Sequence, residues 1–469
     1  KVEVSGVAEA LQADRAEVRG ELGTDAFNNL PIPLGRNFQQ LLVTLPGFSP
    51  ATRGGSSITN PSKALTFNVN GGQRTSTGMR IDGASAVGNW MAESATYAPS
   101  IEAVDTVNAV TSSFDAEEGI AGGAAINVTT KSGTNILHGS LFEYHNDNAL
   151  NARPYFLPAG QNKPKRIMNQ FGGTIGGPIV RDKLFYFVSY EATYERKLAS
   201  GFATVPTPDV RLGNMSASAT PIYDPLTGDA TGAGRTPFVG NIVPQNRISP
   251  IIQKVIPLIP QPTFPGLLSN NYYTSASSPY TRHRVDSKLN WNPTNRLTLS
   301  ARVSALPLRN NVPAVWGTTL VGAALSTGVD DDVGPGISNF WNSQLNVAYT
   351  VSPHFIIDGS FGYTLEDYQL TMAGYNWDKK TGLDVLGIPG TNGPGPNDGG
   401  FPAFAVDSYT KYGGNGGAGR LLAVHDPQQT YSTNASWLKG THNIRFGVDL
   451  LHQDMNHWEP LGVNDTFSF

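Results

Sequence analysis

Five stretches in the second half of the chain alternate between apolar and polar side chains, and this period of two most limits the possible fold. In one of them, Arg284 and Asp286 alternate with Val285 and Ser287. A period of two places the two kinds of side chain on opposite faces of a β-sheet. The pattern predicts amphipathic strands within residues 282–291, 297–303, 343–351, 354–363 and 443–450.

The connections between the predicted strands are alternately very short and very long. Tight turns are expected at residues 178–183, 292–295, 351–353 and 439–440, and long Gly-, Pro- and Asn-rich loops at 148–167, 197–280, 307–338 and 368–427. Loops of this length are uncommon inside compact soluble domains. Short turns at one end and long loops at the other are typical of outer-membrane barrels. About nine strands are predicted, near residues 136–147, 168–177, 184–195, 281–291, 296–304, 340–350, 354–366, 429–438 and 441–452.

The composition agrees with a mainly β protein and excludes several other classes. Charged residues make up 15% of the chain, below the roughly 25% of soluble domains. The chain has 52 Gly, 33 Pro and no Cys, so a disulfide framework, a thiolate metal site and a Cys nucleophile are excluded. A net charge of −4 gives no basic footprint for nucleic acid.

The sequence contains no apolar run of the roughly 18 residues that a transmembrane helix needs. A barrel strand needs only about 10 residues of alternating polarity. Nine is an odd number of strands and leaves open edges, which lipid does not tolerate. The chain starts with KVEVSG, which is neither an initiator Met nor a signal peptide. We therefore expect further strands of the same barrel to lie outside this sequence.

The first third of the chain predicts a different, smaller kind of structure. Apolar residues at Phe38, Leu41, Leu42 and Leu45 have the spacing of one helix face. Short strands are expected at 65–69, 79–81, 104–110 and 125–130, with a turn at Asp82-Gly83 and a Gly-rich acidic bend at 115–123. These elements predict a small α+β unit with few apolar residues, packed inside something larger.

Several segments resemble the TonB-dependent outer-membrane transporters, in their Oar-like branch, which carries a carboxypeptidase-regulatory-like domain. They are LPIPLGRNFQQLLVTLPGF (30–48), FNVNGGQRTSTGMRIDGAS (67–85), IEAVDTVNAV with GGAAINVTTKSG (101–133), GGPIVRDKLFYFVSYE (176–191) and GNIVPQNRISP (240–250). The resemblance implies an antiparallel transmembrane β-barrel of 22 strands with an N-terminal plug domain. It divides the chain into a linker or the end of an upstream domain (1–20), the plug (21–134) and the N-terminal part of the barrel (135–469).

The resemblance also implies roles for residues of the plug. Two outward loops, 49–62 and 84–99, carry the candidate ligand-binding residues Arg53, Asn89, Trp90 and Tyr97. Contacts that hold the plug to the wall are expected from Arg74, Arg80, Asp82, Glu117 and Glu118. Taken alone, the first set could equally cap turns or pack locally, and the second set could be solvated turn charges.

The polar faces of the strands are expected to point into the lumen of the barrel. The alternative is the solvated face of a soluble β-sandwich, which the asymmetry of turns and loops disfavours. The aromatic residues Trp291, Tyr349, Tyr363, Tyr431 and Trp437 lie near strand ends and predict a membrane-interface girdle. The predicted lumen-facing residues are Arg284, Asp286, Lys288, Asn290, Arg302, Gln344, Asn346, Asp358, Arg445 and Asp449.

Motifs for catalysis or for metal binding are weak. There is no Walker A, GxGxxG or GxSxG motif. KSGTN at 131–135 resembles the KTG of penicillin-recognising enzymes, but SxxK and SDN are missing. Residues 330–332 are three Asp in a long loop, and His452, Asp454 and His457 match no metal-binding spacing. We expect neither an enzyme nor a bound metal or cofactor.

Two functions from different classes follow. The first is a TonB-dependent transporter that imports a scarce solute through the outer membrane of a Gram-negative bacterium, gated by the plug. Its partners would be the TonB energy-transducing complex and an unidentified solute, without nucleic acid and as a monomer, and the TonB-contacting box should lie before Lys1. The second is a non-transporting, surface-exposed β protein that binds a partner through its long loops. A passive porin is a third, which the plug-like unit disfavours.

Overall fold

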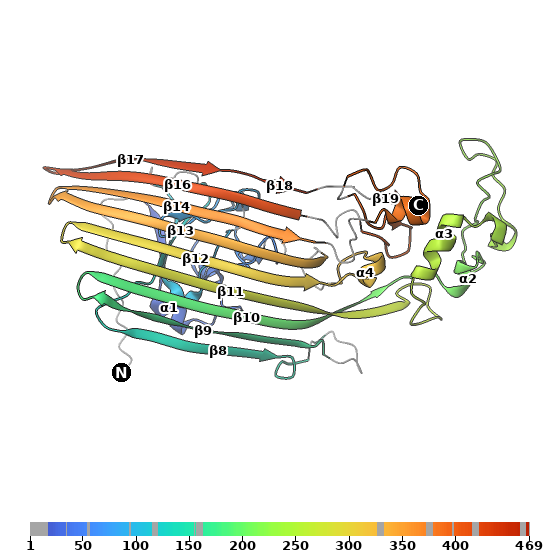
Figure 1. Ribbon diagram of the computed structural model, residues 1–469, viewed down its shortest axis with the longest axis horizontal. Coiled ribbons are helices and arrows are strands. Elements are labelled where there is room, and N and C mark those ends of the chain that lie inside the picture. Colours follow the sequence, from blue (N-terminus) through green and yellow to red (C-terminus); the bar gives the residue numbers. More distant parts are fainter. Residues whose placement is uncertain are drawn as a thin grey trace.

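The computed structural model consists of one large sheet and a small N-terminal unit that lies against it (Figure 1). It describes residues 17–33, 35–53, 57–92, 95–114, 121–153, 155, 163–325, 333–371, 379–395, 398–414, 422–459 and 466–468. No helix in these ranges is long and apolar enough to cross a membrane.

Nine long strands form a single antiparallel layer in which each strand pairs with the next one along the chain. We call this layer the wall. Figure 1 shows it as one continuous sheet, with β8 at one edge and β17 at the other among the described residues. The predicted number of strands is thereby confirmed. The strands are β8 (His138–Asp147), β9 (Arg166–Val180), β10 (Leu184–Ala203), β11 (Tyr272–Thr294), β12 (Leu297–Val312), β13 (Gly334–Ser352), β14 (Phe355–Leu370), β16 (Leu422–Lys439) and β17 (His442–Gln453).

Several strands are longer than the sequence predicts, so the predicted long-loop boundaries at 197, 280, 307 and 338 are wrong. β10 and β11 pair from Leu184↔Trp291 to Ala203↔Tyr272, and β12 and β13 pair as far as Val312↔Gly334. The extra residues carry Ser, Thr, Pro and Gly in place of a clean alternation. Burial still alternates along the extensions of β11 and β13, but many of the alternating side chains are small or polar, so their polarity gives little periodic signal.

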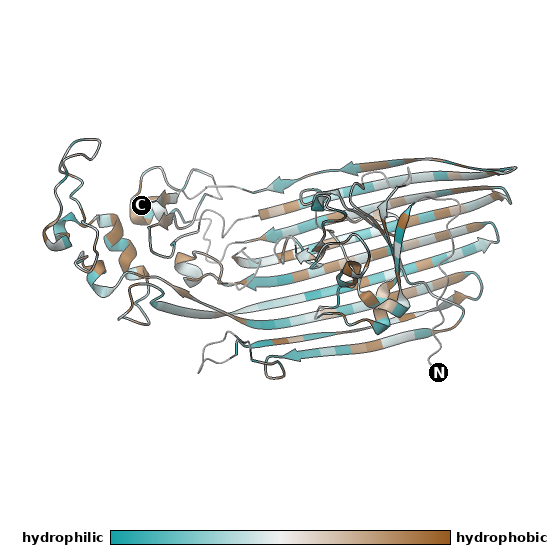
Figure 2. Ribbon diagram, turned by 180° about the vertical axis from the view of Figure 1, so that it is seen from behind, coloured by the Kyte–Doolittle hydropathy of each residue, from teal (hydrophilic) through white to brown (hydrophobic). Residues whose placement is uncertain are grey.

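Burial on the wall is inverted relative to a soluble sheet. Phe446 exposes 59% of its surface on one face, whereas Arg302 exposes 1% on the other. Figure 2 shows hydrophobic and hydrophilic residues alternating along the strands. A sheet with an exposed apolar face and a buried charged face is built for lipid outside and a polar interior. Four of the five predicted girdle residues are exposed on the apolar face, namely Trp291, Tyr349, Tyr431 and Trp437.

The N-terminal unit, residues 18–130, is built on a five-stranded sheet with the order β1-β6-β7-β4-β5. A two-stranded piece lies beside it, and the predicted helix at 38–45 is a 3-10 helix, η1, that buries Phe38, Leu41 and Leu42. The elements are β1 (Val18–Gly23), α1 (Thr24–Asn29), η1 (Phe38–Thr44), β2 (Thr52–Arg53), β3 (Leu65–Thr66), η2 (Arg74–Ser76), β4 (Gly78–Ile81), β5 (Ala84–Ser85), η3 (Ile101–Ala103), β6 (Val104–Ser112) and β7 (Ala125–Thr130).

The main hydrophobic core belongs to both parts. Buried residues of the N-terminal unit, including Phe38 and Tyr97, form one cluster with residues of the wall. The wall residues in this cluster are Tyr280, Leu306, Leu308, Phe340, Tyr368, Leu370, Leu422 and Val424. The small unit therefore completes its core against the wall, as its thin apolar content predicts.

The connections at the long-loop end of the wall fold together into a second cluster, which we call the loop module (residues 204–271, 313–325, 379–414 and 466–468). Its core includes a stack in which Trp316 lies between Tyr272 and Tyr412, at ring-centroid distances of 5.6 and 5.1 Å. These connections are thus a packed structure. The module and its border contain α2 (Pro208–Arg211), η5 (Val239–Asn241), η6 (Gln245–Arg247), α3 (Pro250–Val255), η7 (Ile256–Leu258), α4 (Gly317–Leu320), η8 (Thr381–Leu386), β15 (Ala403–Ala405), β18 (His457–Trp458) and β19 (Thr466–Ser468).

Gly133 lies where the N-terminal unit leads into the wall and allows the two backbones to approach closely. A Cβ at this position would lie 2.2 Å from the carbonyl oxygen of Tyr186 and 2.7 Å from that of Gly177. These contacts are with backbone, which has little freedom to move away.

Gly133→Ala is expected to lower the free energy of unfolding by about 1–3 kcal/mol, the usual cost of an extra methyl group in a packed site. Thermal melting of the purified protein in detergent measures this change. Gly23→Ala is the matched control, because nothing lies within 4 Å of its added Cβ. Equal melting temperatures for the two variants would contradict the expectation.

Candidate functional site: the polar contact between the N-terminal unit and the wall

A two-residue hairpin turn presents a carboxylate to the wall. β4 and β5 pair at Arg80↔Ser85 and Ile81↔Ala84, which leaves Asp82 and Gly83 as the turn. Both have positive φ, 49° and 98°, as a tight turn between antiparallel strands requires. Asp tolerates this conformation better than most residues. The Asp-Gly pair therefore places a charged side chain at the tip of the hairpin.

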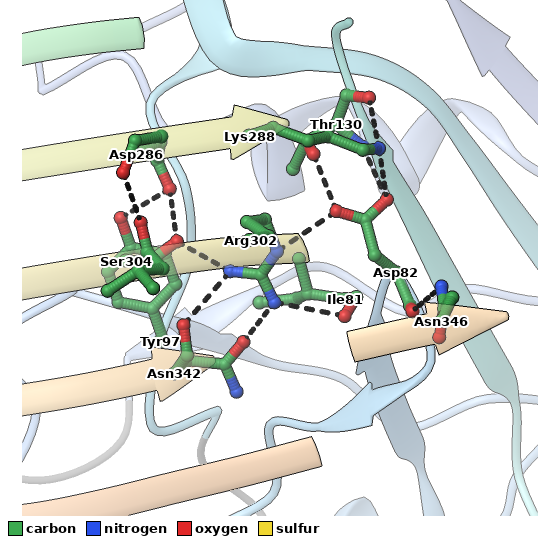
Figure 3. Close-up of polar contacts among 12 residues, drawn as sticks. Ile81, Asp82, Tyr97, Thr130, Asp286, Lys288, Arg302, Ser304, Asn342 and Asn346 are labelled. Carbon is green, nitrogen blue, oxygen red and sulfur yellow. Dashed lines mark hydrogen bonds and ion pairs between the residues drawn. The ribbon is translucent and has the colours of Figure 1, made fainter. Parts of the chain in front are cut away.

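Asp82 is the centre of a network that joins the N-terminal unit to three wall strands (Figure 3). Its carboxylate forms ion pairs with Lys288 Nζ at 3.0 Å and with Arg302 Nε at 2.9 Å. It also accepts hydrogen bonds from the backbone N–H and hydroxyl of Thr130, at 3.1 and 2.5 Å. Asn346 donates to the backbone oxygen of Asp82 at 3.0 Å. Two buried cations thus contact one buried carboxylate, and the two donors of Thr130 satisfy its other hydrogen-bond acceptor sites.

A second network surrounds Glu191 on β10. Arg284 and Arg282 pair with its carboxylate at 3.1 and 3.3 Å, and all three side chains are almost fully buried. Ser100 of the N-terminal unit donates to the same carboxylate at 2.8 Å. Arg284 also donates to the backbone oxygen of Ser62 at 3.4 Å. Arginine side chains of the wall therefore hold both a wall carboxylate and the backbone of the N-terminal unit.

Tyr97 of the N-terminal unit joins the Asp82 network through Asp286, Ser304 and Arg302. Its hydroxyl donates to Asp286 Oδ1 at 2.8 Å, and Ser304 donates to the same atom at 2.7 Å. Complete burial, followed by the neighbouring Asp286 charge, raises the pKa of the Tyr97 phenol well above its usual value. The phenol therefore keeps its proton and remains a donor to Asp286.

The candidate plug-apex residues do not form one group. Tyr97 is fully buried in the contact with the wall, where its hydroxyl donates to Asp286, and its contact with a ligand stays a prediction. Asn89 donates to the backbone oxygen of Asp454 at 3.0 Å. Trp90 is partly exposed, with its ring edge-on to His457 at 5.5 Å. The backbone of Arg53 belongs to β2, and its side chain lies outside the description.

The residues predicted to hold the N-terminal unit have different positions. Asp82 is described above, and Arg80 forms an ion pair of 2.7 Å with Asp449 of β17. Arg74 lies in η2 and is exposed. Glu117 and Glu118 lie outside the described residues.

Most of the predicted lumen-facing residues lie on the buried face of the wall. Arg284, Asp286, Lys288, Arg302 and Gln344 are buried, whereas Arg445 and Asp449 near the β17 edge are exposed. The remaining three, Asn290, Asn346 and Asp358, are half-buried.

The sequence analysis missed the acidic partner Glu191 and the serines that contact this network. Glu191 belongs to an alternation in β10 in which Ser189, Glu191 and Thr193 are buried, while Val188, Tyr190 and Tyr194 are exposed. Extending the period-two analysis to residues 184–195 would have found it. Ser62 and Ser100 lie in loops and give no such signal.

The His and Asp residues considered as metal ligands in the sequence do not form a metal site in the part of the chain that the structure describes. No set of three or more His, Asp or Glu side chains there could hold a metal ion. His457 instead pairs with Asp426 at 2.6 Å, and His452 lies 3.6 Å from Asp454 at an exposed position. Residues 330–332 lie outside the described ranges.

An antiparallel sheet with an apolar outer face and a polar inner face, holding a small α+β unit by charged contacts, defines an outer-membrane β-barrel protein with an internal domain. Comparison with known proteins agrees. Residues 129–469 match the family described as outer membrane beta barrel domain. The chain belongs to this family and is a protein of the Gram-negative outer membrane.

Two relatives show how much of a longer protein this chain resembles. It is 33% identical over 135 residues to the TonB-dependent transporter Oar of Myxococcus xanthus, which covers 27% of the chain and 12% of Oar. Its fold is similar to that of the outer-membrane transporter YddB of Escherichia coli, with a TM-score of 0.56 and 11% identity, over 94% of this chain and 48% of YddB. The chain thus spans about half of YddB and a smaller part of Oar.

Asp82→Asn is expected to lower the free energy of unfolding by about 3–5 kcal/mol, since it leaves two buried cations without a charge partner. The N-terminal unit should also become more sensitive to trypsin. Both properties are measured on the purified protein in detergent. Asp105→Asn, at an exposed position of β6, is the control, and an equal effect of both substitutions would argue against a special role of Asp82.

Tyr97→Phe is expected to cost about 1–3 kcal/mol, because Asp286 loses a buried donor. The pKa of Tyr97 is raised in the folded protein, so its contribution is complete below the unfolded value of about 10 and is lost as pH rises through the folded pKa. The stability difference between the original protein and Tyr97→Phe should therefore persist from neutral pH to about pH 10 and shrink in more strongly alkaline buffer. Chemical denaturation at several pH values measures it, with Tyr349→Phe on the outer face as control, and a difference that disappears between neutral pH and about pH 10 would refute this role.

Proposed function

We propose that this chain is the plug and part of the barrel of a TonB-dependent transporter, which imports a scarce solute through the outer membrane. In this proposal residues 21–134 are the plug, 135–469 belong to the barrel and 1–20 lead in from an upstream domain. The observation that carries the proposal is the position of the N-terminal unit, which lies against the polar face of the wall and is fixed there by Asp82, Lys288 and Arg302.

The chemistry of this contact suits a gate. Ion pairs and hydrogen bonds hold the unit in a single position, yet each of them has an aqueous substitute when water enters. The elements that move in a protein come from its less stable parts. A pull by the TonB complex on the N-terminal side would break these contacts and open a path along the polar face of the wall. We expect no catalytic activity and a monomer without nucleic acid.

The second candidate is a surface protein that binds a partner through its long loops without transport. The loop module favours it, since it has its own hydrophobic core and exposes large apolar residues such as Leu226, Val239 and Leu268. A folded module of this kind is suited to recognition. Recognition also precedes transport, so the two candidates differ in whether the N-terminal unit must move.

A disulfide between the unit and the wall tests that movement. A Cβ on Gly83 would lie 3.8 Å from the Cβ of Ser360, which equals the usual separation in a disulfide of about 3.8 Å. The chain has no Cys, so Gly83→Cys with Ser360→Cys introduces one defined pair. The positive φ of Gly83 adds strain of about 1–3 kcal/mol, which the single variants control for.

The full-length protein with this cysteine pair is expressed in the bacterium that naturally produces it. Mass spectrometry then follows the loss of small solutes from the medium. We expect the oxidised pair to abolish the uptake of one solute, and reduction or either single variant to restore it. A protonophore should also abolish the uptake. Uptake that persists in the locked protein would refute the gate, and binding of a solute without uptake in every variant would favour the surface-binding protein.

A further inference from the structure

A small cavity lies between the N-terminal unit and the wall, outside the two networks described above. Its volume is about 10 Å³, which suits one particle of the size of a water molecule. Glu366 and Tyr368 of β14 contribute the wall side, and residue 59 with residues in 88–91 and 95–96 contribute the other. The lining residues are Thr59, Gly88, Trp90, Met91, Ala95, Thr96, Glu366 and Tyr368.

Glu366 is a buried carboxylate without a cationic partner among the described residues. It exposes 7% of its surface and accepts one hydrogen bond, from the backbone N–H of Asn89 at 3.2 Å. Asp426 lies directly opposite it on the neighbouring strand. Asp426 is already paired with His457 at 2.6 Å and accepts from the backbone N–H of Asn456 at 2.7 Å. A buried carboxylate keeps its negative charge only beside a compensating charge or a metal ion, and Glu366, unlike Asp426, has no cationic neighbour among the described residues.

A second, independent observation concerns another residue that lines this cavity. The hydroxyl of Thr96 is buried, with 4% of the residue exposed, and has no hydrogen-bond partner in the part of the chain that the structure describes. Unpaired buried hydroxyls are uncommon and indicate a missing partner. Gly88 keeps the space open, since a Cβ there would lie 2.8 Å from the carbonyl oxygen of Met91 and 3.0 Å from Glu366 Oε1. A carboxylate, a hydroxyl and a carbonyl therefore border one small space.

We propose that this cavity binds one small hard cation through the oxygens of Glu366, Thr96 and Met91. Oxygen atoms of these three types are the ligands that such cations prefer. The cation supplies the charge that Glu366 lacks and the partner that Thr96 lacks. It fastens residues 88–92 and 95–96 of the N-terminal unit to β14, which makes this end of the contact dependent on ions in the medium.

Terbium luminescence tests the proposal on the full-length protein, purified in detergent and freed of metal. Tb³⁺ is a hard cation that prefers oxygen ligands, and Trp90 in the cavity wall lies close enough to sensitise its emission. We expect the Tb³⁺ emission to saturate and to fall when Ca²⁺ or Na⁺ displaces the bound Tb³⁺. The ion that displaces Tb³⁺ at the lower concentration represents the class of cation that the site binds. The same ion should raise the melting temperature.

Three variants and a control locate the site. Glu366→Gln keeps the size of the side chain and removes its charge, so the Tb³⁺ midpoint should rise about tenfold or more. Thr96→Val should raise it less, and Trp90→Phe should remove the emission while the effect of the ion on melting remains. Asp367→Asn changes the next carboxylate, which pairs with His425 on the outer face, and should leave the midpoint unchanged.

The proposal fails if the unaltered protein shows neither emission nor a melting temperature that depends on cations. It also fails if Glu366→Gln binds Tb³⁺ as the unaltered protein does. A variant Glu366→Gln that melts higher in every salt, with no ion effect in the unaltered protein, would show that a proton neutralises Glu366 instead.

Discussion

Lipid offers no hydrogen bonds to a polypeptide backbone, and the architecture of the wall follows from this constraint. Every backbone group of a membrane-spanning strand must pair with a neighbouring strand. The pairing β8 to β17 runs strictly in chain order with antiparallel neighbours, so one face of each strand meets lipid and the other faces inward. The apolar outer face and the charged inner face are two results of the same requirement.

The charged inner face in turn creates the need for the N-terminal unit. Lys288, Arg302 and Arg284 are almost fully buried in the described structure, and cations at such positions need acidic or carbonyl partners. The Asp82 turn, the backbone of Ser62 and the wall carboxylate Glu191 provide them. The hydrophobic core of the unit is continuous with wall residues such as Phe340. Each part thus supplies what the other lacks.

The sequence predicted those features that have a local cause. Alternation predicted the strands and their faces, and the Asp-Gly pair predicted the turn that carries Asp82. A period of two and a positive φ each favour particular residue types at neighbouring positions, so the sequence reveals them. Pairings between distant segments produce no such local pattern. The contact of Tyr97 with Asp286, that of Ser100 with Glu191 and the opposition of Glu366 and Asp426 depend on the register between the unit and the wall. The pattern within one segment does not contain that register.

The contact between the two parts is graded along the strands. On β11 the salt-bridged Lys288 lies near the short turn at Thr294, whereas Tyr280, nearer the loop module, belongs to the shared apolar core. Between these two positions lie the buried ion pairs of Arg282 and Arg284 with Glu191. Force from the short-turn end would therefore meet ion pairs along most of β11 before it reaches the apolar contacts, whose separation exposes hydrocarbon to water. A partial displacement of the N-terminal unit at the short-turn end breaks fewer contacts than its complete release.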